Sequence, residues 1–90
     1  MYSLKPTPYE VSKAIAQRHR LIRKQLKMSQ AEIAERSGVS LGSLKRFENT
    51  GKIALESLIK LMHIMGRLDD FDNVLKAKEN HGDIEKLFSK

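Results

Sequence analysis

The chain has 90 residues, of which 17 are Lys or Arg, 11 are Asp or Glu and none is Cys. This length allows a single domain, and the lack of cysteine excludes a disulfide framework, a thiolate metal site and a thiol nucleophile. No apolar run approaches the ~18 residues of a membrane span, and the first residues lack the apolar segment of a signal peptide. We therefore expect a cytoplasmic protein stabilised by its apolar core, a situation that favours locally packed helices.

The net charge of +6 is concentrated in the first half of the chain. Residues 1–52 carry eleven Lys and Arg against four Asp and Glu, a net charge of +7, whereas residues 53–90 carry six against seven. A segregated basic half indicates a polyanionic partner, with nucleic acid first and an acidic membrane surface second. A charge excess that only improves solubility is the alternative at this point.

The first predicted helix spans about residues 8–26. Thr7 is a favourable N-cap, Pro8 stands at the first helical position, and Glu10 completes a capping box. Apolar residues then recur at helical spacing. The polar side of this helix is basic, and we expect its cations to flank a nucleic-acid backbone; they are Arg18, Arg20, Arg23, Lys24 and Lys27.

Two short helices joined by a tight turn are predicted next. A second capping box begins at Ser29, and Gly38 supplies the left-handed residue that ends this helix. Ser40 caps the following helix, which covers about residues 41–49 and is closed by Gly51.

The C-terminal part is predicted to contain a helix at about 55–65 and a fifth, short helix. The fifth helix is capped by Asp69 and includes Phe71, Val74 and Leu75. No segment alternates strongly with period two, so the fold class is all-α, with a domain at 1–75. Residues 76–90 form a short tail whose structure, whether helix, strand or disorder, the sequence leaves open.

The stretch at about residues 30–49 has the pattern of a helix-turn-helix. Ala34 is small where the second helix crosses, Val39 fills the turn, and Leu44 and Phe47 hold the second helix to the core. This motif presents its second helix to the major groove of DNA.

The pattern resembles the Xre/Cro-type helix-turn-helix regulators, which include phage repressors and many antitoxins. The residues that carry the resemblance are Ser29-Gln30, Ile33-Ala34, Gly38-Val39-Ser40, Leu44, Phe47-Glu48, Gly51, Leu58, Leu61 and Gly66. Residues 44–48, followed by Gly51 and by residues 68–71, look most like the HipB-type antitoxin branch. The resemblance implies a five-helix, lambda-repressor-like domain that binds a palindromic operator as a homodimer. It also implies repression of its own operon, often beside a toxin kinase of the HipA type.

Helical geometry selects the candidates for reading bases, once Leu44 and Phe47 are taken as buried. These candidates are Leu41, Gly42, Ser43, Lys45 and Arg46. Lys45 and Arg46 can donate hydrogen bonds to guanine or to phosphate. Leu41 and Gly42 have no side-chain hydrogen bond to offer a base. We therefore expect specificity to depend on Lys45 and Arg46, or on DNA shape.

A second group of residues is expected to contact phosphates: Ser29, Gln30, Ser40, Asn49, Thr50 and Lys52. The two serines stand at helix N-termini, where backbone N–H groups favour anions. The resemblance implies that Gln30 braces against both the phosphate backbone and the recognition helix. Glu48 lies on the inward side of its helix, and we expect it to pair with an arginine of the first helix, Arg23 being the candidate.

The C-terminal region holds more apolar residues than one short helix can bury. We expect several to form a dimer interface, and the candidates are Leu68, Phe71, Val74, Leu75, Ile84, Leu87 and Phe88. A two-fold dimer would place two recognition helices about 34 Å apart on one face of DNA. The alternative is that these residues only close the core.

No catalytic arrangement, metal-ligand spacing or cofactor motif is evident, so the sequence predicts a protein that is not an enzyme and needs no metal or cofactor. Two alternatives to an operon-repressing antitoxin stay open. One is a phage-type or stand-alone regulator, and the other is a protein-binding adaptor with a helix-turn-helix fold that no longer binds DNA. A membrane-surface role for the first helix is a more distant third.

Overall fold

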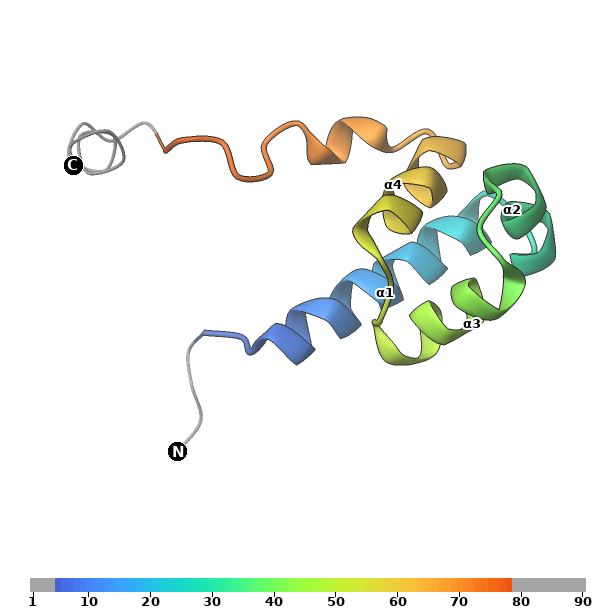
Figure 1. Ribbon diagram of the computed structural model, residues 1–90, viewed down its shortest axis with the longest axis horizontal. Helices are drawn as coiled ribbons and strands as arrows, with labels where there is room; N and C mark the ends of the chain where they lie inside the picture. The colour runs from blue at the N-terminus through green and yellow to red at the C-terminus, as the bar shows by residue number, and fades with distance from the viewer. Residues whose placement is uncertain (1–4, 79–90) are drawn as a thin grey trace.

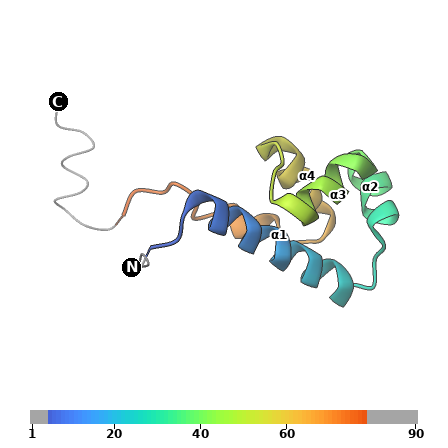
Figure 2. The same ribbon diagram turned by 90° about the horizontal axis from the view of Figure 1, so that it is seen from below.

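The computed structural model describes residues 5–78, which form four α-helices and one 3-10 turn, without a strand in this range. The elements in chain order are α1 (Pro8–Gln25), α2 (Gln30–Ser37), α3 (Leu41–Thr50), α4 (Leu55–Ile64) and the 3-10 turn η1 (Leu68–Phe71). Figure 1 shows the long α1 running diagonally, and the turned view of Figure 2 shows α2, α3 and α4 on one side of it. The all-α prediction is confirmed for the described residues.

The helix starts follow from local capping. Thr7 Oγ1 accepts from the Glu10 backbone N–H at 3.1 Å, and Glu10 Oε1 accepts from the Thr7 N–H at 2.7 Å, so the predicted capping box is present. Ser29 accepts from the Glu32 N–H at 3.0 Å. Here only half of the predicted box is seen, because the Glu32 carboxylate pairs with Arg36 at 3.0 Å.

Two glycines end α2 and α3 in the left-handed conformation, as predicted. Gly38 and Gly51 both have φ +82°, and their N–H groups donate to carbonyls one turn earlier, at Ala34 and Phe47. Gly51 also lies against α1, because a Cβ at this position would be 2.9 Å from the backbone carbon of Ser12. The end of α3 is therefore packed closely on the N-terminal half of α1.

The core lies where α3 packs on α1 and where α2 packs on both α3 and α4. Its fully buried members are Ala16, Ile33, Leu44, Phe47 and Leu61, and Ala34, Val39, Met62 and Met65 are nearly so. The small residue at the predicted crossing and the valine in the predicted turn are thus buried as expected. The sequence predicted an apolar stripe along α1, but the buried side of this helix is largely polar. His19 is 1% exposed and Arg23 is 8% exposed. Arg23 is therefore not part of the basic surface of α1.

The prediction of a fifth α-helix is wrong. Only a 3-10 turn forms, at residues 68–71, and it is preceded by Arg67 in place of the expected cap Asp69. Arg67 pairs with Asp70 across this turn at 3.0 Å. Leu75 has φ +61° and is 98% exposed, so the chain cannot continue as a right-handed helix there. Within the described residues, the domain has four α-helices and not five.

Candidate nucleic-acid interface

The outer surface of α3 carries all five residues predicted to read bases. Leu44 and Phe47 anchor the helix, with 0% and 1% exposure, and the five candidates between and beside them are exposed: Leu41, Gly42, Ser43, Lys45 and Arg46. Within residues 5–78, the side chains of Lys45 and Arg46 have no hydrogen-bond or ion-pair partner. The helix therefore presents two cations without ion-pair partners to solvent, while its inner side is packed in the core.

The inner surface of α3 is fixed by Glu48, which is 6% exposed. Arg23 donates from Nε to Oε2 and from Nη2 to Oε1, each at 2.9 Å, so the expected pair between these residues is confirmed. Gln30 Nε2 donates to Oε1 at 2.9 Å, and His19 Nδ1 lies 2.9 Å from Oε2. One carboxylate thus joins α1, α2 and α3. Sequence reasoning missed His19, although its position four residues before Arg23 places both on one face of α1.

The two titratable groups at this junction have shifted pKa values. Burial lowers the pKa of His19 below its ordinary value, and the hydrogen bond to Glu48 offsets only part of this effect. Burial alone would raise the pKa of Glu48, but the hydrogen bonds from Arg23, Gln30 and His19 together hold it below its ordinary value. We therefore assign an ionised Glu48, and a neutral His19 that donates its Nδ1–H to it.

Several residues predicted to contact phosphates also have roles within the domain. Ser29 and Ser40 cap α2 and α3, and the Ser40 hydroxyl donates to Ser43 Oγ at 2.8 Å. Gln30 is half-buried and reaches Glu48, which agrees with a brace against the recognition helix. The structure thus places these side chains at the N-termini of α2 and α3, as expected.

The segment that follows α3 is held by its own hydrogen bonds. The Thr50 hydroxyl donates to the Arg46 carbonyl at 2.7 Å and accepts from the Lys52 N–H at 3.2 Å. The Asn49 carbonyl accepts from Lys13 Nζ of α1 at 2.6 Å. The side chains of Asn49 and Lys52 are exposed and available to a ligand.

A polar cavity of about 290 Å³ brings together residues that the sequence assigned to different roles. Its lining residues are Ser43, Arg46, Lys52, Ile53, Ala54 and Ser57. Arg46 was predicted to read bases and Lys52 to bind phosphate, yet both line this cavity. It lies at the start of α4, where Ala54 provides no side-chain cap for the first N–H groups. Two cations beside an uncapped helix N-terminus suit an anionic group such as a phosphate.

The predicted dimer residues fall into three groups. Leu68, Val74 and Leu75 are exposed, at 42%, 56% and 98%, whereas Phe71 is half-buried against the core. Ile84, Leu87 and Phe88 lie outside the described residues. In the part of the chain that the structure describes, no helix is both long and apolar enough to cross a membrane.

Comparison with known proteins gives one match. Residues 20–71, more than half of the chain, match a protein-family model described as Helix-turn-helix. The matched region begins in the second half of α1 and includes α2, α3, α4 and η1. No curated protein and no solved structure matches the chain.

Proposed function

This chain belongs to the Xre/Cro-like helix-turn-helix family of DNA-binding transcriptional regulators, and we propose that it acts as a homodimeric repressor of a palindromic operator. The observation that carries this proposal is the outer surface of α3. Its two cations have no partner within the described residues, while the inner surface is locked to α1 and α2 through Glu48. Such a helix is suited to enter the major groove without rearranging.

Base reading is assigned to the N-terminal and central part of α3. Arg46 and Lys45 can each donate to the O6 and N7 acceptors of guanine. Leu41, which is 37% exposed, can contact the methyl group of thymine. Because Gly42 offers no side chain, the remaining specificity comes from close backbone approach and from DNA shape.

Phosphate binding is assigned to the helix N-termini and to the segment after α3. Ser29 and Ser40 stand at the N-termini of α2 and α3. Lys52 lines the polar cavity at the start of α4, together with Arg46. These contacts fix the register of the domain on DNA and supply the salt-dependent part of the affinity.

Dimerisation is proposed through the exposed apolar residues after α4, which are Leu68, Val74 and Leu75. A single helix-turn-helix domain has too few base contacts for tight, selective binding, and two-fold symmetry doubles them. The finer proposal is that the protein is a HipB-like antitoxin that represses its own operon and binds a HipA-like toxin kinase. It is supported by the resemblance at residues 44–48 and 68–71. Co-expression with the product of the neighbouring gene, followed by purification of a complex, tests this partner.

The central experiment measures affinity for duplex DNA as a function of salt concentration. We expect a steep fall of log K with log salt, of about one unit for each phosphate contact. The Lys52→Ala variant is expected to have a shallower slope, whereas Lys76→Ala removes the same charge from the segment after η1 and leaves the slope unchanged. A flat response in the wild-type protein would contradict DNA binding and favour a protein-binding adaptor.

A further inference from the structure

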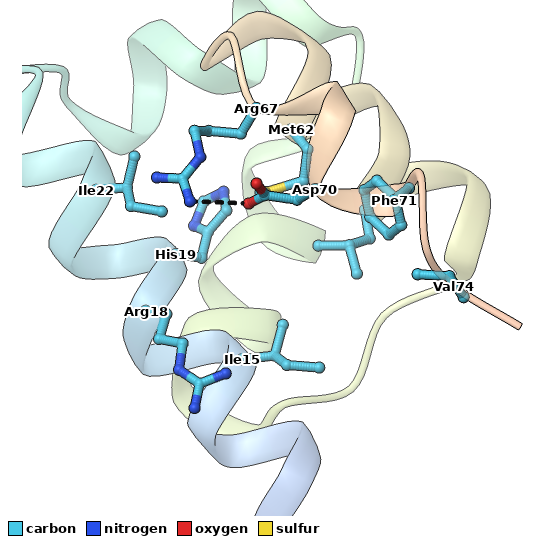
Figure 3. Close-up of a pocket in the computed structure, with 10 residues that line it drawn as sticks. Ile15, Arg18, His19, Ile22, Met62, Arg67, Asp70, Phe71 and Val74 are labelled. Atoms are coloured by element: carbon cyan, nitrogen blue, oxygen red, sulfur yellow. Dashed lines mark ion pairs between the residues drawn. The ribbon is translucent and has the colours of Figure 1, made fainter. Parts of the chain in front are cut away.

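A second cavity, of about 280 Å³, lies between α1, α4 and η1 (Figure 3). Most of its wall is apolar and comes from Ile15, Ile22, Leu58, Met62, Phe71 and Val74. The polar side chains that line it are Arg18, His19 and the Arg67–Asp70 ion pair. Of the α1 cations expected to flank a nucleic-acid backbone, Arg18 alone lines the cavity, and none of the base-contacting or phosphate-contacting candidates does. The cavity therefore lies apart from the outer surface of α3, although it shares Val74 with the proposed dimer interface. Its volume is close to the lower limit of the volumes at which proteins bind small molecules.

His19 gives this cavity a polar anchor. Its Nε2 is the one buried side-chain nitrogen or oxygen within residues 5–78 that lacks a hydrogen-bond partner. Nδ1 faces Glu48 of α3, and the two ring nitrogens of an imidazole point to different sides of the ring. Nε2 therefore points away from Glu48, and His19 is one of the residues that line the cavity. A buried polar atom without a partner is costly and rare in native proteins.

The chemistry of the missing partner follows from the Glu48 carboxylate. Because that carboxylate only accepts, Nδ1 carries the hydrogen of the neutral ring, and Nε2 presents a lone pair. The partner must then donate a hydrogen bond. Its remaining surface must be apolar, to match the aliphatic and aromatic wall. Met62, an unbranched and adaptable side chain, can move to admit it.

We propose that this cavity binds a small, largely apolar molecule that carries one hydroxyl or N–H donor, which His19 Nε2 accepts. Two hydrogen bonds would connect such a ligand to the recognition helix. The first joins the ligand to His19 Nε2, and the second joins His19 Nδ1 to Glu48 of α3. The cavity thus gives the domain a way to sense a small molecule beside α3. This inference goes beyond DNA binding, and its readouts need no DNA.

Two bicyclic probes of nearly equal shape test the inference on the full chain. Indole carries one N–H donor, whereas indene carries none. We expect indole to bind about tenfold more tightly than indene, because indene leaves Nε2 unpaired. Nitrogen NMR of the imidazole is expected to show that the Nε2 resonance of His19 moves on titration with indole and stays in place with indene.

A matched pair of variants locates the binding. Ile15→Phe places a larger side chain in the cavity and is expected to abolish indole binding. Val11→Phe, one turn earlier on α1 and similarly exposed at 43% against 37%, is expected to leave binding unchanged. In His19→Asn, the amide can still donate to Glu48 but no acceptor takes the place of Nε2, so the preference for indole over indene is expected to disappear.

Three results would each overturn the proposal. The first is that the wild-type chain binds the two probes with equal affinity, or binds neither of them. In that case water would be the only partner of Nε2. The second is indole binding that survives Ile15→Phe. The third is an Nε2 resonance that moves with protein concentration without a probe, because a second copy of the chain would then fill the cavity.

Discussion

Arg23 of α1 holds both carboxylate oxygens of Glu48 of α3, through two hydrogen bonds of 2.9 Å each. The Arg23 side chain is 10% exposed and that of Glu48 is 2% exposed, so this pair lies in the interior of the domain. Bidentate pairing of a guanidinium with a carboxylate fixes geometry as well as charge. The recognition helix is thus oriented by a residue that is 25 positions earlier in the chain.

Removal of Arg23 is expected to destabilise the fold strongly. Arg23→Ala leaves the buried Glu48 carboxylate with only His19 and Gln30, and loss of one partner of a buried ion pair costs about 3–5 kcal/mol. The free energy of unfolding in urea measures this loss. Arg36→Ala is the control: it breaks the exposed Glu32–Arg36 pair and should cost about 0.5 kcal/mol or less. Equal costs for the two variants would contradict a structural role for Arg23.

Stability is expected to fall with decreasing pH in two steps. The pKa of His19 is lowered on folding, so below its ordinary value of 6.5 the unfolded chain binds a proton that the folded chain does not. The pKa of Glu48 is also lowered, which adds a second loss below its ordinary value of 4.5. Both contributions are fully present at higher pH. Urea unfolding between pH 8 and pH 3 measures the profile. In His19→Asn we expect the first step to vanish and the second to stay.

The two left-handed glycines that end α2 and α3 are expected to differ in their tolerance of alanine. Gly38→Ala meets no atom within 4 Å, so its cost is the backbone strain of about 1–2 kcal/mol. Gly51→Ala has the same φ, but its Cβ would lie 2.9 Å from the Ser12 backbone. We expect about 1–3 kcal/mol in addition, because a backbone cannot move aside as a side-chain tip can. Thermal or urea unfolding of both variants gives the comparison, and similar values would refute the close packing of α3 on α1.

Gly42 is expected to serve DNA binding and not the fold. It lies near the start of α3, is exposed, and has no atom within 4 Å of an added Cβ. Gly42→Ala is therefore expected to stabilise the protein by about 0.5–1 kcal/mol. The same methyl group would stand between the helix backbone and the DNA, so affinity for DNA should fall. Parallel unfolding and DNA titrations measure the two effects. A variant that is more stable and binds DNA as well as wild type would show that the backbone at Gly42 does not approach DNA closely.

Replacing Arg46 or Lys52 by alanine is expected to impair DNA binding in two different ways. If Arg46 reads a base, Arg46→Ala loses about 1–3 kcal/mol of discrimination at one base pair of an operator selected from random duplexes. Lys52→Ala weakens binding to all sequences alike. Because both residues line one cavity, Arg46→Ala could instead behave as Lys52→Ala does, which would reassign Arg46 to a phosphate. Binding measured on the operator and on its single-base variants distinguishes these results.

Local signals in the sequence predicted the helix boundaries well. Thr7, Ser29 and Ser40 cap the helices as expected, and Gly38 and Gly51 end them, because a capping hydroxyl and a left-handed glycine act within a few residues. The pair of buried residues that anchors α3 was predictable for the same reason, since helical periodicity is local.

Features that depend on distant partners were harder to predict. A count of charges places Arg23 on the basic surface of α1, but burial beside Glu48 depends on where α3 crosses. His19 was missed because its role requires that same crossing. The fifth helix was predicted from apolar residues such as Val74 and Leu75, which are exposed in the structure. Of the candidate site, the exposed surface of α3 was predictable, whereas the meeting of Arg46 and Lys52 in one cavity depends on the start of α4.

The junction at Glu48 has a consequence for the thermodynamics of DNA recognition. Three helices are tied to one carboxylate before any DNA is present, so the ordering entropy of the reading surface is lost on folding and not on binding. We therefore expect binding without the large negative heat-capacity change of coupled folding. A preorganised helix of this kind does not adapt to an ill-fitting half-site. The deformation needed for a fit then falls on the DNA, whose stiffness varies with sequence.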